Sequence, residues 1–114
     1  MAYDHALADR IRELLAGEAG VAEQRMFGGL AFLINGNMSV AASGQGGLLV
    51  RVDPEESAAL IDDERVRPMV MRGRTMRGWL RVDAAAVAGP SQLDQWVARG
   101  VSYARSLPAK AARR

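Results

Sequence analysis

The residues with the clearest potential for chemistry are arginines gathered in the second half of the chain. Six of them fall within seventeen residues: Arg65, Arg67, Arg72, Arg74, Arg77 and Arg81. A guanidinium group can hold a carboxylate or a phosphate through two parallel hydrogen bonds, and Gly73 and Gly78 let a partner approach the backbone closely. We therefore predict a partner-binding surface on four of these arginines: Arg72, Arg74, Arg77 and Arg81. The alternative is a solvated hairpin whose arginines pair with acidic helices of the same domain.

No group of residues in the sequence matches a catalytic or metal site. His5 is the only histidine and there is no cysteine, which excludes a thiolate nucleophile and leaves a serine triad with no base except His5. The acids of Asp62-Asp63-Glu64 are adjacent, whereas the ligands of a calcium loop are spaced, so we interpret them as a solvated helix end. The segment Gly44-Gln45-Gly46-Gly47 lacks the Lys-Ser/Thr of a phosphate-binding loop. We predict a protein that is not an enzyme and that has no cofactor.

Charge is distributed unevenly along the chain. Residues 1–64 hold eleven acids and four bases, a net charge of −7, whereas residues 65–114 hold two acids and eleven bases, a net charge of +9. The basic half suits an acidic protein surface or nucleic-acid phosphates. Neutralisation of one half by the other across the fold is the alternative interpretation. No segment has the pattern of a DNA-recognition helix.

Size and composition indicate one domain in a reducing compartment. The chain has 114 residues, of which 49% are hydrophobic and only 5% aromatic, so aliphatic side chains must fill the core. Five methionines either complete that core, which is the simpler account, or form an adaptable binding face: Met26, Met38, Met69, Met71 and Met76. Because we find no cysteine, no signal peptide and no long apolar run, we expect a cytoplasmic protein with no membrane partner.

Three segments have the periodicity and the end signals of helices. Residues 4–17 carry leucine and isoleucine on one stripe between a capping aspartate and a glycine. Residues 53–62 begin with Asp-Pro, which is typical of a helix start. Residues 91–107 begin with Ser91 and Asp94 in an arrangement like a capping box. These helices must cover the strands that lie between them.

Three strands are predicted between the first and second helices. The first runs through residues 23–34, with Gly28-Gly29 as a bulge or bend inside it. Asn35-Gly36 is the pair typical of a tight hairpin turn. The next strand places three apolar side chains on one face: Met38, Val40 and Ala42. The third strand covers residues 48–52. Leu48, Val50 and Val52 lie on one of its faces, and Leu49 and Arg51 lie on the other.

Two short strands are predicted before the last helix, near residues 69–71 and 78–82, joined by the arginine-rich connection 72–77. The resulting order predicts an α+β domain, α-β(3)-α-β(2)-α, in which helices cover an antiparallel sheet in two layers. We find no repeat and no linker. Residues 1–108 are therefore predicted to form one domain, and residues 109–114 a basic, frayed tail.

Several segments, in their order and spacing, resemble the N-terminal domain of the TfoX/Sxy family. They are Arg25-Met26-Phe27-Gly28-Gly29-Leu30, Asn35-Gly36-Asn37-Met38, Leu49-Val50-Arg51-Val52, Arg67-Pro68-Met69, Gly73-Arg74-Thr75-Met76-Arg77-Gly78-Trp79 and Ala104-Arg105-Ser106-Leu107-Pro108. The resemblance covers nearly the whole chain and indicates a stand-alone domain of that type. Ser39 and Thr75 depart from it, because the family pattern leads us to expect an aromatic residue and a proline there.

The resemblance implies a fold like that of secretion chaperones and a regulatory role without catalysis. The namesakes of the family regulate natural competence in bacteria and act with the cyclic-AMP receptor protein at competence promoters. The family supplies no catalytic residues to carry over. We therefore expect a non-enzymatic domain that binds a protein partner, such as a transcription factor, in transcriptional control.

Two other functions stay open at this point. The Arg-rich C-terminal half could bind nucleic acid without sequence specificity, with an affinity that falls steeply with salt. A small enzyme with an unrecognised site would need a deep polar pocket that holds perturbed carboxylates. A homodimer is compatible with each function, because the edge strands of a small sheet need covering.

Overall fold

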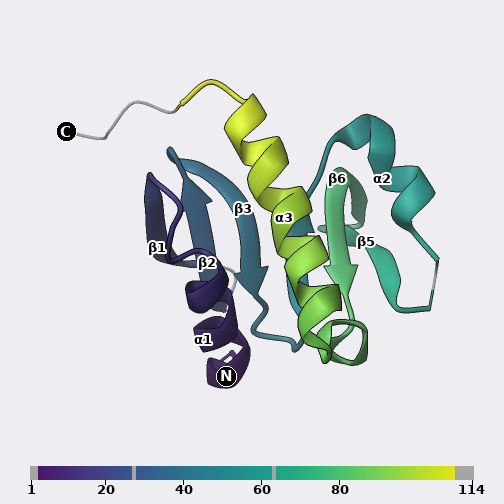
Figure 1. The fold of residues 1–114 in the computed structure, drawn as a ribbon. Helices are drawn as coiled ribbons and strands as arrows, with labels where there is room; N and C mark the ends of the chain where they lie inside the picture. Colours follow the sequence, from purple (N-terminus) through teal and green to yellow (C-terminus); the bar gives the residue numbers. More distant parts are fainter. Residues whose placement is uncertain (1–2, 27, 63, 110–114) are drawn as a thin grey trace.

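The computed structural model describes residues 3–26, 28–62 and 64–109, and within them it confirms an α+β fold with an antiparallel sheet (Figure 1). The helices are α1 His5–Leu14, α2 Pro54–Leu60 and α3 Pro90–Ser106, with the short 3-10 helix η1 Ala84–Val87. The strands are β1 Val21–Met26, β2 Gly29–Ile34, β3 Asn37–Ala42, β4 Leu48–Arg51, β5 Val66–Met71 and β6 Arg74–Val82. Their order across the sheet is β1-β2-β3-β4-β6-β5. Of the predicted tail, residues 109–114, only Ala109 lies within the described residues.

Two of the three helix starts have the predicted caps. The Asp4 carboxylate accepts the backbone N–H of Leu7 at 3.2 Å and begins α1. The Asp53 carboxylate accepts the N–H of Glu55 at 2.9 Å and begins α2. The predicted capping box at the start of α3 is wrong, because this helix begins at Pro90, after Gly89, without a side-chain cap. Proline at the first helical position has no N–H that would need such a cap.

The first predicted strand is in fact a hairpin. β1 and β2 pair antiparallel in an unbroken register from Val21 opposite Ile34 to Met26 opposite Gly29. Gly28 has a φ of 75°, so the chain reverses direction at the glycine pair and does not merely bulge there. The element order is therefore α-β(4)-α-β(2)-α. Phe27, which the sequence places in this segment, lies outside the described residues.

A bulge in β3 overturns the predicted alternation of that strand. Phe32 lies opposite Val40 but Leu33 lies opposite Met38, so Ser39 is the extra residue. A bulge shifts the phase of the side chains that follow it, and Met38 consequently belongs to a different apolar cluster from Val40. The buried Ser39 hydroxyl donates to the Phe32 carbonyl at 2.8 Å, which satisfies it inside the sheet.

The two late strands are longer than predicted, and this changes the arginine-rich connection. β5 ends at Met71 and β6 begins at Arg74, so the connection is the two-residue turn Arg72-Gly73. Arg74 and Arg77 therefore lie on β6 rather than in a loop. The β5–β6 pairing is irregular after Pro68, because Pro68 lies opposite Leu80 while Met69 lies opposite Met76.

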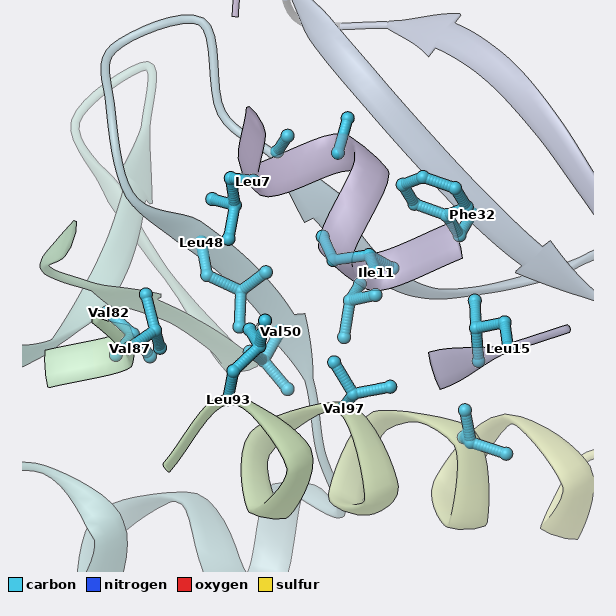
Figure 2. Packing of buried hydrophobic residues seen from close by; sticks show 14 of the residues in the cluster. Leu7, Ile11, Leu15, Phe32, Leu48, Val50, Val82, Val87, Leu93 and Val97 are labelled. Carbon is cyan, nitrogen blue, oxygen red and sulfur yellow. The ribbon is translucent and has the colours of Figure 1, made fainter. Parts of the chain in front are cut away.

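The main core lies between the helices and one face of the sheet. Figure 2 shows Ile11 of α1 and Val97 of α3 facing Phe32 of β2 and Val50 of β4. Leu60 and Ile61, at the end of α2, pack against the same cluster. The burial of these side chains is what holds the helices to the sheet. We call this side of the sheet the helix face.

An ion-pair group also ties α1 to the edge strand β1. The Arg12 guanidinium donates to both carboxylate oxygens of Glu23, at 2.6 and 2.9 Å, and to Asp9 at 2.6 Å. The hydrogen bonds from Arg12 hold the pKa of Glu23 below its ordinary value, and those to the two carboxylates raise the pKa of Arg12. All three side chains are more than one-third exposed, so water screens their attraction.

Candidate functional site

A second apolar cluster occupies the side of the sheet opposite the helix face. Its buried members are Ala31, Met38, Ala41, Leu49 and Met69, and its half-buried members are Met26, Leu33, Met71, Met76 and Trp79. Every one of these residues belongs to a strand, and no described helix contributes a side chain. We call this side of the sheet, from β1 to β5, the open face.

The open face gathers the five methionines that the sequence singled out. Met38 and Met69 are buried in it, whereas the other three are half-buried: Met26, Met71 and Met76. The methionines therefore do pack into an apolar cluster, as the core-filling prediction expects, but no described helix contributes to that cluster. Methionine side chains are flexible and polarisable, so such a layer can adapt to the shape of a partner.

Two hollows on the open face are lined by described residues. The larger, of about 500 Å³, lies between β5 and the turn that joins β3 to β4. Its floor is Leu49 and Met69, and Arg67, Arg72 and Arg81 stand at its walls. The smaller, of about 410 Å³, is lined by Gln24, Met26, Leu33, Gly36, Met38, Arg51 and Trp79. Both hollows combine apolar floors with guanidinium groups, a composition suited to binding apolar and acidic groups together.

Strand register decides which predicted arginines face this surface. Residues directly opposite in an antiparallel pair point to the same side of the sheet. Arg81 lies opposite Leu49, and Arg74 lies opposite Met71, so both arginines belong to the open face. Arg72 lines the larger hollow from the turn. Arg77, in the irregular stretch before Gly78, lines neither hollow.

None of the four predicted arginines forms an ion pair with another residue of the described ranges. The ion pairs found there join Arg12 to Asp9 and Glu23, Arg67 to Asp83, and Arg105 to Glu18. Among the described residues, these four arginines therefore do not pair with the acidic helices of their own domain. Their guanidinium groups keep their hydrogen-bonding capacity for water or for a partner.

Arg51 is a site residue that the sequence analysis missed. Its guanidinium carbon lies 5.2 Å from the centre of the Trp79 ring and 5.6 Å from that of the Tyr103 ring on α3. These distances allow cation–π attraction to both rings. The signal was present in the alternation of β4, where Leu49 and Arg51 point away from Leu48 and Val50. That pattern could not show, however, that Trp79 would lie directly across the strand pair.

The residues considered above for catalysis or metal binding include Asp62 and His5, and each of these two can be placed in the fold. The Asp62 carboxylate accepts the backbone N–H groups of Glu64, Arg65 and Val66 at 2.8–2.9 Å, which lowers its pKa. Asp62 therefore closes the turn into β5, while Asp63 lies outside the described residues. His5 is exposed at the start of α1, with its ring 4.5 Å from that of Tyr3. Within the described ranges, no group of three acidic or histidine side chains could hold a metal ion.

A third hollow, of about 380 Å³, lies between α2 and α3. Asp53, Glu56 and Tyr103 are among its lining residues. The Asp53 carboxylate already serves as the cap of α2. Of the two carboxylates in its lining, Asp53 thus has a structural task and Glu56 is exposed. No described helix has both the length and the apolar composition that a bilayer crossing requires.

Comparison with known proteins places the chain in a family. The family model described as TfoX N-terminal domain matches residues 13–104, which is most of the chain. The chain therefore belongs to the TfoX N-terminal domain family. No curated protein and no solved structure matches it at the significance required. The predicted likeness to secretion chaperones accordingly stays a prediction.

Proposed function

We propose that this TfoX N-terminal domain is a non-enzymatic binding domain whose open face contacts a protein partner in the cytoplasm, in the control of transcription. One observation carries the proposal: a methionine-rich sheet face without a covering helix is bordered by arginines that form no ion pair among the described residues. The family membership supports a TfoX-like domain.

The chemistry of the open face defines the partner. Its centre is apolar and adaptable, which favours aliphatic or aromatic side chains on the other molecule. Its border carries Arg72, Arg74 and Arg81, whose planar guanidinium groups pair best with carboxylates. A protein segment that presents apolar side chains beside Asp or Glu satisfies both requirements. A nucleic-acid backbone satisfies only the second, because its phosphates would leave the methionines uncovered.

Site-specific photo-crosslinking tests where the partner binds. A benzophenone amino acid at Met71 lies on the open face, and the same group at Leu14, an exposed apolar residue of α1, is the matched control. We expect one protein to crosslink from position 71 and not from position 14. Equal crosslinking from both positions would remove the open face from the proposal.

Arginine variants test the chemistry of the contact. The triple change Arg72→Ala, Arg74→Ala and Arg81→Ala should abolish the crosslink from position 71. Arg77→Ala, which removes a charge that lines neither hollow, should leave it intact. The captured protein, once purified, should bind the wild-type domain in calorimetry and lose at least tenfold in affinity for the triple variant, since charge-assisted hydrogen bonds are the strong ones. An unchanged affinity would contradict the proposal.

Binding to a labelled DNA duplex tests whether the partner is nucleic acid and not a protein. If fluorescence anisotropy shows tight binding at about 50 mM salt that collapses by about 200 mM, phosphate contacts dominate. Loss of that binding in the triple variant, together with an absence of protein crosslinks, would replace the protein partner by nucleic acid. We expect no such binding.

A further inference from the structure

The two edges of the sheet are protected to different degrees. At the β5 edge, Pro68 has no backbone N–H to offer, and the pairing is irregular directly after it. At the β1 edge, six residues without proline run in an unbroken register, and β1 is the outermost strand on its side of the sheet (Figure 1). Unpaired backbone groups on a regular edge strand are a template for another strand. Of the two edges, the β1 edge therefore meets the requirements for pairing with a further strand better.

The hydrogen bonding of β1 shows which of its backbone groups point outward. The backbone N–H of Asn35 donates to the Gly20 carbonyl at 3.0 Å, in line with the β1–β2 register. Residues whose backbone groups face the neighbouring strand alternate along an antiparallel ladder. Ala22, Gln24 and Met26 thus face β2, whereas three residues present their N–H and C=O groups at the outer edge: Val21, Glu23 and Arg25.

Only one central register of β1 against a second copy of itself brings opposite charges together. When two copies pair antiparallel about Gln24, Glu23 of each copy lies opposite Arg25 of the other, and these are the residues whose outward backbone groups form the ladder bonds. A register centred on Glu23 would place the two Glu23 carboxylates opposite each other. One centred on Arg25 would oppose two guanidinium groups. Like charges directly opposite are unfavourable.

We propose that two copies of this chain associate through their β1 strands, antiparallel and centred on Gln24. Isologous pairing of this kind gives a closed two-fold dimer. α1 packs against β3 and α3 and reaches β1 through the side-chain pairing of Arg12 with Glu23. Among the described residues, no backbone hydrogen bond from another segment reaches the outer groups of β1. This inference is independent of the proposed function, but it has a consequence for the open face. Gln24 and Met26 line the smaller hollow, and the second copy would place its Ala22 beside Met26.

A single engineered cysteine reads out the register directly, because the chain has no cysteine of its own. At the centre of the dimer, the two copies of residue 24 form a pair without ladder bonds, with Cα atoms about 4.5 Å apart, which is within the range of a disulfide. We expect Gln24→Cys to form a disulfide-linked dimer under mild oxidation. Ala22→Cys, on the same face two residues away, should stay unlinked. Linkage at position 22 instead of 24, or at neither, would overturn the proposal.

Complementary charge variants test the association in solution without a crosslink. By sedimentation velocity at micromolar concentration, the wild type should be a dimer. Arg25→Glu and Glu23→Lys should each be monomeric, because each opposes like charges. An equimolar mixture of the two should form a heterodimer, because every opposed pair then has opposite sign. Circular dichroism checks that Glu23→Lys, which loses its pairing with Arg12, remains folded. A monomeric wild type, or a mixture that stays monomeric, would contradict the proposal.

Discussion

Asn35 and Arg72 occupy the same position in two hairpin turns of one sheet. Each is the first residue of a two-residue connection, with φ of 52° and 54°, and each precedes a glycine with φ of 85° or 77°. Asparagine and glycine tolerate this left-handed backbone, which is why Asn-Gly is the favoured pair in such turns. Arginine does not share that tolerance. A strained residue at a surface turn that borders a hollow supports the hypothesis that the Arg72 side chain is functional.

Replacing Arg72 by asparagine should therefore stabilise the fold. We expect Arg72→Asn to raise the free energy of unfolding by up to about 1 kcal/mol, because it relieves the left-handed strain. Urea denaturation with an unchanged slope measures this difference. Asn35→Arg, the reciprocal change, should lower it by at least as much. If Arg72→Asn were destabilising instead, the arginine would make intramolecular contacts that outweigh the backbone strain.

A close approach between α3 and β3 makes a second prediction. A Cβ atom at Gly100 would lie 2.6 Å from the Ser39 carbonyl oxygen and 2.8 Å from a Val40 methyl group. Gly100→Ala should lower the free energy of unfolding, because overpacking costs about 1–3 kcal/mol and alanine returns only about 1 kcal/mol of helix propensity. Gly17→Ala is the matched control, since no heavy atom lies within 4 Å of its added Cβ. Equal effects of the two substitutions in denaturant would show that α3 can shift away from the sheet.

The features that the sequence predicted correctly are local ones. The cap at Asp4, the Asp53-Pro54 helix start and the Asn35-Gly36 turn each depend on a few consecutive residues, and each is present in the structure. Arg72-Gly73 was not recognised as a turn, because arginine is not a residue that such turns favour. The sequence therefore predicts β5 and β6, the strands on either side of this turn, as shorter than they are.

The features that escaped prediction depend on contacts between distant segments. The bulge at Ser39 moves Met38 to the open face, and no pattern within β3 alone reveals it. Ser39 is also one of the two departures from the expected family pattern, and the close approach of Gly100 shows that little space remains over its backbone. The methionines were identified by type, but their gathering on one uncovered face follows from the pairing of six strands.

The contact between Arg51 and Trp79 gives a spectroscopic prediction. In a Trp96→Phe background, Trp79 is the only tryptophan, so its emission reports on the open face. Arg51→Ala should shift that emission to the red and lower the free energy of unfolding by about 0.5–1 kcal/mol, as expected for an exposed cation–π contact. Arg99→Ala is the control, because Arg99 lies over Trp96, at 4.7 Å, and not over Trp79. A response to Arg99→Ala equal to that of Arg51→Ala would show that the emission does not report the contact.

The turn into β5 predicts a pH dependence that is specific to Asp62. The pKa of its carboxyl is lowered from the ordinary 3.8, chiefly by the backbone N–H groups of Val66, Glu64 and Arg65. A group with a lowered pKa in the folded state stabilises the fold above its unfolded value, and this contribution is lost as the pH falls through the folded value. Wild type should therefore be more stable than Asp62→Asn at neutral pH, and the difference should shrink as the pH falls below 3.8.

Thermal unfolding of the two proteins across the acid range measures that difference and cancels the titration of the other carboxylates. Hydrogen exchange of backbone amides shows where in the fold the difference arises. The N–H groups of Glu64, Arg65 and Val66 should exchange faster in Asp62→Asn, because its neutral amide is a weaker acceptor than a carboxylate. Protection of amides in α3 should change only as far as global stability changes. A stability difference that stays constant from neutral to acid pH would mean that the charge of Asp62 does not stabilise the turn, and that the shape of its side chain alone closes it.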